Sequence, residues 1–96
     1  MAGLKAVDTH YFFPPARAYP LNRFLFRLKS DAALRDRFLA DAEGAMDGHG
    51  VDAQARAALA TLERDALIAL GAHPYLVFMA HLRLDMARTP GTFEHF

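Results

Sequence analysis

Hydrophobic positions follow the spacing of α-helices along the middle of the chain, and no useful stretch alternates with the period of a β-strand. After Pro20, apolar residues recur at i, i+3, i+4 and i+7, on one side of a helix, as Leu21, Phe24, Leu25 and Leu28. Proline suits the first turn because the N–H it lacks would have no helical partner there. The pattern predicts a first helix with one core-facing side and an all-α fold class.

Four more helices are expected, each bounded by capping or breaking residues. They are a helix that follows a Ser30 or Asp31 cap and ends at Gly48-His49-Gly50, one from Asp52 to about Ala60, one over 62–70 between a Thr61 cap and Gly71, and one from Pro74 to about Ala87. The pattern leaves open whether the third and fourth are continuous. The sequence predicts a single domain of about five short helices at 20–88, an extended arm at 1–19 and an irregular tail at 89–96.

The last predicted helix is apolar on every side for about two turns, from Tyr75 to Leu82. Either it is the central helix of a small bundle, or one side packs on sister helices and the other on a second protein. Phe26 lies off the apolar side of the first helix and has no obvious core role. The aromatic run at 11–13 either packs back on the domain or lies on another chain. These residues contribute to a hydrophobic share of 53%, which is high for 96 residues.

Charge and composition narrow the class of protein. Eleven basic residues balance eleven acidic ones, so nucleic-acid binding by phosphate neutralisation is not expected. Between Arg17 and Arg37, however, the sequence contains six basic residues but only two acidic ones. This basic stretch is either ordinary helix decoration or attracts an anionic partner surface or acidic aromatic substrate. With no cysteine, no signal-like start and an apolar run at 66–82 that Gly71 and Pro74 interrupt, we expect a cytoplasmic protein without a membrane helix.

Catalytic and metal-binding patterns are absent from the sequence. Among the five histidines, His73 and His81 are eight positions apart, or about 12 Å along a helix, which is too far for two ligands of one ion. His81 and Asp85 are spaced i, i+4, but a surface pair of this kind is commoner than a catalytic dyad. The only serine, Ser30, is more economically interpreted as a helix cap. We therefore predict no catalytic residue, metal ligand or cofactor in this chain.

Two segments resemble a known family. The most specific parts of the resemblance are Leu21-Asn22-Arg23-Phe24 and the corner Leu67-Ile-Ala-Leu-Gly-Ala-His-Pro-Tyr-Leu76. Together with the residues around them, over roughly 17–80, they are similar to the small (alpha) subunit of the protocatechuate 4,5-dioxygenase family, that is, a LigA-like subunit. Many members carry a bulky aromatic residue after the Arg-Asp pair, where this chain has Ala66.

The resemblance implies a division of labour between two subunits. Enzymes of this type are extradiol dioxygenases that open a catecholic ring with dioxygen at an Fe(II) held by two histidines and a carboxylate in the large (beta) subunit. The small subunit covers the mouth of that site. The resemblance thus implies a non-catalytic chain whose partners are the large subunit, with its Fe(II), and a catecholic substrate. The candidate interface or lid residues are Phe26, His73, Tyr75 and Phe78, with a core or corner role as the alternative for each.

Two other functions stay open at this point. The chain could be a stand-alone helical adaptor of the same fold, self-associating as a homo-oligomer and without a dioxygenase partner. It could also be a small ligand-binding protein that uses the helix from Tyr75 to Leu82. For the leading hypothesis the substrate is not determined, since protocatechuate, gallate, aminophenols and biaryl diols all fit.

Overall fold

The computed structural model describes residues 16–88 and places them in one 3-10 turn and six α-helices. The elements are η1 (Ala16–Ala18), α2 (Tyr19–Ser30), α3 (Ala32–Ala40), α4 (Ala42–Met46), α5 (Ala53–Thr61), α6 (Arg64–Ala69) and α7 (Pro74–Arg88). No strand occurs within this range, and the all-α fold class is confirmed. The predicted arm at 1–15 and tail at 89–96 lie outside the described residues. Residues 16–19, predicted as the end of an extended arm, are helical instead.

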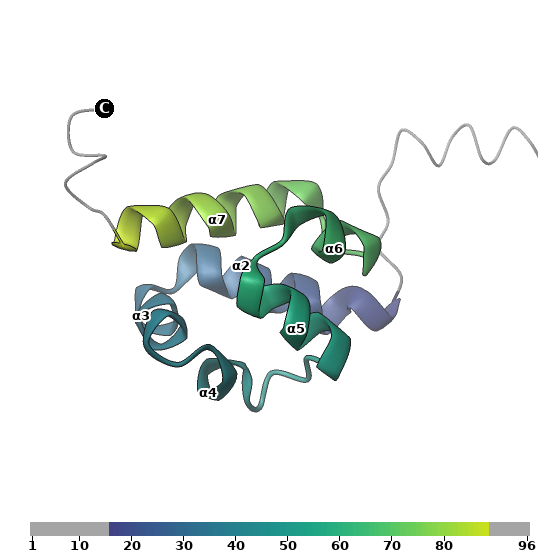
Figure 1. Cartoon of the computed structure of the whole chain (residues 1–96), viewed down its shortest axis with the longest axis horizontal. Coiled ribbons are helices and arrows are strands. Elements are labelled where there is room, and N and C mark those ends of the chain that lie inside the picture. The colour runs from purple at the N-terminus through teal and green to yellow at the C-terminus, as the bar shows by residue number, and fades with distance from the viewer. Residues whose placement is uncertain (1–15, 89–96) are drawn as a thin grey trace, which may run out of the picture.

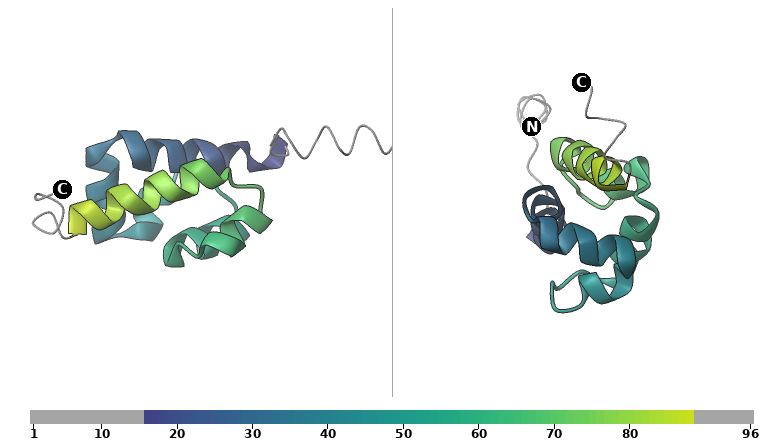
Figure 2. Two further views of the ribbon diagram at one scale, coloured as in Figure 1. Left: turned by 90° about the horizontal axis from the view of Figure 1, so that it is seen from above. Right: turned by 90° about the vertical axis from the view of Figure 1, so that its left-hand side faces the viewer.

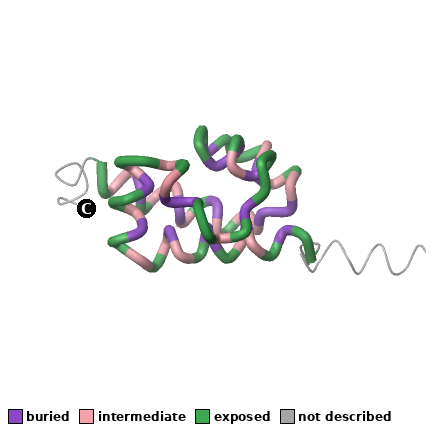
Figure 3. The backbone as a smooth tube through the Cα atoms, turned by 90° about the horizontal axis from the view of Figure 1, so that it is seen from below, coloured by how far each residue is buried: buried purple, intermediate pink, exposed green. Residues whose placement is uncertain are grey.

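The first and last long helices, α2 and α7, run side by side along the molecule (Figures 1 and 2). Helices α3 and α4 lie near the end where α2 and α7 finish, and α5 and α6 lie near the end where α7 begins (Figure 1). The core forms between these helices, and each of them contributes at least one buried residue (Figure 3). The apolar residues predicted for the first helix are all buried, and the ring of Phe24 packs against that of Phe38 with centroids 6.0 Å apart.

Acidic side chains begin four of the helices by accepting a hydrogen bond from a backbone N–H of the first turn. The pairs are Asp31 with Leu34 at 3.2 Å, Asp41 with Gly44 at 3.1 Å, Asp52 with Ala55 at 2.9 Å, and Glu63 with Ala66 at 3.3 Å. The bond from Leu34 and the guanidinium of Arg27 lower the pKa of Asp31. The caps at Asp31 and Asp52 agree with the sequence prediction.

Two further predicted boundaries are wrong. The second predicted helix is two helices, because Asp41 adopts an extended conformation and begins α4 anew. Thr61 is not the cap of α6: its hydroxyl donates to the carbonyl of Ala58, and Glu63 is the cap. Helices α5 and α6 are separate, since Leu62 between them has a left-handed backbone with φ of 54°.

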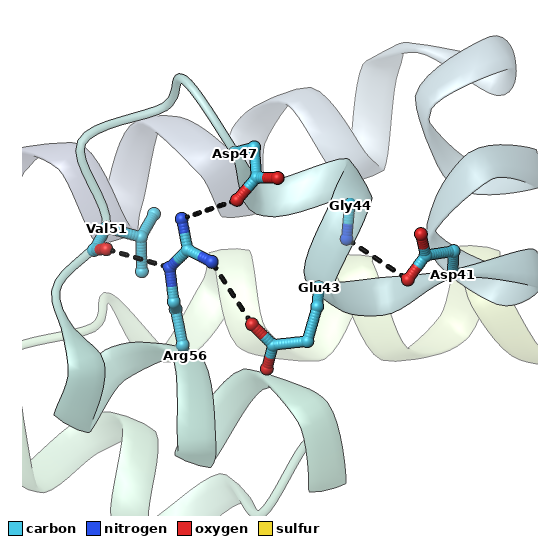
Figure 4. Close-up of polar contacts among 6 residues, drawn as sticks. All are labelled: Asp41, Glu43, Gly44, Asp47, Val51 and Arg56. Carbon is cyan, nitrogen blue, oxygen red and sulfur yellow. Dashed lines mark hydrogen bonds and ion pairs between the residues drawn. The ribbon is translucent and has the colours of Figure 1, made fainter.

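Arg56 of α5 holds the short helix α4 and the turn after it (Figure 4). Its guanidinium lies 3.1 Å from the carboxylate of Glu43 and 3.0 Å from that of Asp47, and its Nε donates to the carbonyl of Val51 at 3.2 Å. Hydrogen bonds to Asp47 and Glu43 raise the pKa of Arg56. One side chain thus fixes the path of the chain from α4 to α5, including the glycine turn at 48–50.

Candidate functional site

A polar junction joins α2 to the corner between α6 and α7. The side-chain amide of Asn22 donates to the carbonyl of Gly71 at 3.0 Å and to that of Ala18 at 3.2 Å, and its oxygen accepts from the N–H of His73 at 2.7 Å. Gly71 has φ of 101°, a conformation that L-residues with a Cβ rarely adopt. The two sequence segments that carry the family resemblance therefore meet at one point of the fold.

His73 is built into this corner. Besides the bond from its backbone to Asn22, its ring Nδ1 accepts a hydrogen bond from the N–H of Tyr75 at 3.1 Å, within the first turn of α7. That contact satisfies one of the donors that a helix start leaves without an intrahelical partner. The half-buried His73 thus fixes the start of α7 and, with it, the direction in which Tyr75 points.

Four large apolar side chains are exposed within residues 16–88, and all four belong to α2 and α7. They are Tyr19 (64% exposed), Phe26 (51%), Tyr75 (55%) and Phe78 (62%), and we call them the aromatic surface. Tyr19, Asn22 and Phe26 are spaced i, i+3, i+7, so the two rings lie on the flank of α2 that bonds the corner. Lys29 covers part of the Phe26 ring, with Nζ 4.9 Å from its centroid.

Helix α7 has two apolar sides. Val77, Ala80 and Leu84 are buried against the other helices, whereas Tyr75, Phe78 and Leu82 recur with the same spacing on the opposite side. The second side is exposed at Tyr75 and Phe78 and half-exposed at Leu82. Within residues 16–88, α7 is therefore not a completely surrounded central helix.

The structure places the four candidate residues in two groups. Phe26, Tyr75 and Phe78 are exposed, while His73 is part of the corner that orients Tyr75. The sequence analysis missed Tyr19, because the first helix was expected to start at Pro20. Its spacing of seven from Phe26 would have revealed it on a helix extended by one residue. Whether these residues contact a partner stays a prediction.

The donor set of the described residues does not fit an Fe(II) centre. Within 16–88 no three His, Asp or Glu side chains lie close enough to hold a metal ion. His81 and Asp85 lie close together, with Nδ1 and Oδ2 3.8 Å apart. However, Nε2 of His81 lies 3.1 Å from the carbonyl of Leu62, and Asp85 also pairs with Arg88. An Fe(II) site with open positions needs two imidazoles and a carboxylate on one face.

The described helices can be compared with what a membrane-spanning helix requires. Across residues 16–88, no helix combines the length and the apolar character needed to cross a bilayer.

Comparison with known proteins gives one match. The model of the family described as "Aromatic-ring-opening dioxygenase LigAB, LigA subunit" matches residues 21–94, which include both segments joined by Asn22. No curated protein and no solved structure gives a significant match. The family match spans most of the chain and confirms the resemblance read from its sequence. This chain belongs to the LigA subunit family of aromatic-ring-opening dioxygenases.

Proposed function

We propose that this chain is a non-catalytic small subunit that docks its aromatic surface on a larger, Fe(II)-bearing extradiol dioxygenase subunit and covers the mouth of the active site. The family description names a two-component enzyme, and a ring-opening dioxygenase needs a metal centre that the described residues of this chain do not fit. The observation that carries the proposal is the exposure of Tyr19, Phe26, Tyr75 and Phe78 on the paired helices α2 and α7.

The energetics of the aromatic surface favour a protein partner. Burying one large apolar side chain contributes about 1.5–3 kcal/mol, and aromatic residues dominate the binding energy of many interfaces. Four exposed rings on one pair of helices therefore represent several kcal/mol that the isolated chain leaves unused. The helices are held together by buried contacts and by the Asn22 junction, so the rings are presented without a large ordering cost.

A lid of this kind has a chemical purpose. Closing the mouth of a site excludes water, strengthens the electrostatic interactions inside and orders the substrate at the metal. In this arrangement the partner holds Fe(II) and the catecholic substrate, and α7 supplies an apolar wall. The ring substituents would be recognised mostly by the partner.

Association with the large subunit tests the proposal. We expect a large subunit to be encoded near this chain. The two proteins are purified separately, and their dissociation constant is measured by isothermal titration calorimetry. We expect Phe78→Asp to weaken binding at least about tenfold, because a carboxylate would be buried among apolar groups. The fold should survive, since the Phe78 side chain faces solvent. Ala33→Asp, which adds the same carboxylate at an exposed position of α3, is the matched control.

Ring cleavage gives a second readout of the same experiment. Cleavage of protocatechuate or a related catechol by the large subunit should rise when the wild-type chain is added and should rise less with Phe78→Asp. Unchanged affinity of Phe78→Asp would refute the role of the aromatic surface. An isolated chain that retains one Fe(II) and turns over a catechol would refute the assignment of chemistry to the partner. A stable homo-oligomer that ignores the large subunit would favour the stand-alone adaptor.

A further inference from the structure

A basic hollow lies on the flank of α2 away from Phe26, between this helix and the glycine turn after α4. Its volume is about 170 Å³, and its wall is formed by Pro20, Arg23, Phe24, Arg27, Gly48 and His49. Arg23 and Arg27 are one helical turn apart, so both guanidinium groups project from the same side of α2. The hollow contains none of the residues of the aromatic surface.

The backbone and side-chain contacts of His49 hold it in place in this hollow. Gly48 and Gly50 on either side have φ of 82° and 75°, which turns the chain back toward α2. The N–H of His49 donates to the carbonyl of Met46 at 3.2 Å, and its ring meets the Phe24 ring edge-on with centroids 5.1 Å apart. The ion pair between Arg56 and Asp47 holds the preceding residues, so the imidazole forms a fixed wall of the hollow.

Positive charge around His49 is only partly compensated. Burial lowers the pKa of His49, and the charges of Arg27, Arg37 and Arg23 lower it further. Arg27 pairs with Asp31 at 3.3 Å, but neither Arg23 nor Arg37 has an ion-pair partner within residues 16–88. Three guanidinium groups therefore act on the His49 imidazole, and of the three only Arg27 has a carboxylate partner among residues 16–88. A bound anion would relieve this repulsion.

We propose that the hollow is a binding site for an oxyanion, a phosphate or carboxylate group, held by Arg23 and Arg27 with His49 as a third contact. Guanidinium groups present paired N–H donors that match the oxygens of these anions. The volume accommodates a small anion or the end group of a larger one, and it is below the range of sites for drug-sized ligands. The proposal does not depend on the aromatic surface or on a dioxygenase partner.

The ring of His49 reports directly on occupancy. An anion beside the imidazole offsets the three positive charges, so binding should raise the pKa of His49. The C–H signals of His49 are followed by NMR in the full chain at constant pH and ionic strength, with chloride replaced stepwise by inorganic phosphate in one series and by acetate in another. We expect a saturable shift toward the protonated position in at least one series, and the responding series tells whether the site prefers phosphate or carboxylate.

Two variants separate a built site from general ion effects. Arg23→Gln keeps an exposed polar side chain and should weaken the apparent affinity at least about fivefold, while Arg64→Gln, an exposed arginine on α6 outside the hollow, should leave it unchanged. Backbone amide spectra of both variants check that the fold is retained. A His49 signal that does not saturate in either series, or that responds equally in Arg23→Gln, would overturn the proposal.

Discussion

Asn22 joins two parts of the fold that are distant in the sequence. A side-chain amide offers both a carbonyl acceptor and an amino donor, and Asn22 uses both on the corner at 71–73, about fifty positions away in the chain. Bonds between side chain and backbone at that separation link elements that local structure cannot align. A residue that stands as one polar position on an amphipathic helix in the sequence is thus the connection between the two family segments.

Replacing Asn22 by leucine tests this connection. Leucine has a similar volume but leaves the N–H of His73 and the carbonyl of Gly71 without their bonds, and each buried polar group left unsatisfied costs about 1–3 kcal/mol. We expect Asn22→Leu to lower the free energy of unfolding by roughly 2–4 kcal/mol in urea titrations. Asn22→Asp, which keeps the acceptor for His73, should lose less. A change for Asn22→Leu within experimental error of zero would show that the corner is held by packing alone.

Individual helices differ in how well the sequence predicted them. Helix α2 was predicted because one uninterrupted apolar side marks it, and α7 because Pro74 begins it. The break at Asp41 was missed because apolar residues continue with helical spacing on both sides of it, while the cap that interrupts the helix is a local contact with Gly44. The sequence predicted Thr61 as the cap of α6, but the left-handed turn at Leu62 separates Thr61 from this helix, and Glu63 is the cap instead.

The features of the candidate site also differ in how well the sequence predicted them. Phe26 lies off the apolar side of its helix, which the hydrophobic pattern shows. For Tyr75 and Phe78 the pattern left open a central helix, and only the structure shows their exposure. The junction at Asn22 and the hollow around His49 arise only when distant elements meet, and spacing along the chain contains no information on that. Sequence patterns therefore indicated which helices carry a surplus apolar side, but not what holds them together.

Leu62 combines a buried side chain with a backbone conformation that suits glycine. Leu62→Ala keeps the left-handed backbone and removes buried volume, so it should cost roughly 2–4 kcal/mol of unfolding free energy. Leu62→Gly removes the β-carbon as well but relieves the backbone, and should still be more stable than Leu62→Ala by about 0.5–1 kcal/mol.

The order of these two variants is the informative result. Within a regular helix alanine is more stable than glycine, so a reversed order identifies the left-handed turn. Thermal and urea unfolding of both variants would measure it. If Leu62→Ala were the more stable of the two, the separation of α5 from α6 would not depend on the backbone of Leu62.

For the whole molecule, the burial of His49 and the positive charges around it link stability to pH. The folded state lowers the pKa of His49 below its ordinary value of 6.5, so between the two values the unfolded chain binds more protons. Unfolding free energy must therefore rise with pH through this window. The contribution of His49 to the unfolding free energy is complete above pH 6.5 and is lost as the pH falls through the lowered pKa. Asp31 acts in the same direction in a separate window, since its lowered pKa contributes above 3.8 and is lost at more acidic pH.

Substitution of His49 by glutamine should reduce the change of unfolding free energy with pH in the window below pH 6.5. Urea unfolding from pH 4 to pH 8, in a buffer free of phosphate and carboxylate, measures the slope for the wild type and for His49→Gln. The wild type should lose stability on acidification below 6.5, and the variant should lose less. Equal slopes in the two proteins would mean that His49 titrates alike in the folded and unfolded chain.

The pairing of α2 with α7 has a consequence for synthesis in the cell. These helices are the first and last α-helices of the described part, and they pack on each other along the molecule. While the ribosome is still making α5 and α6, the growing chain has no partner for the side of α2 that α7 will cover. The core is therefore completed only after the final helix has left the ribosome, and at that moment the outer side of α7 becomes available for assembly.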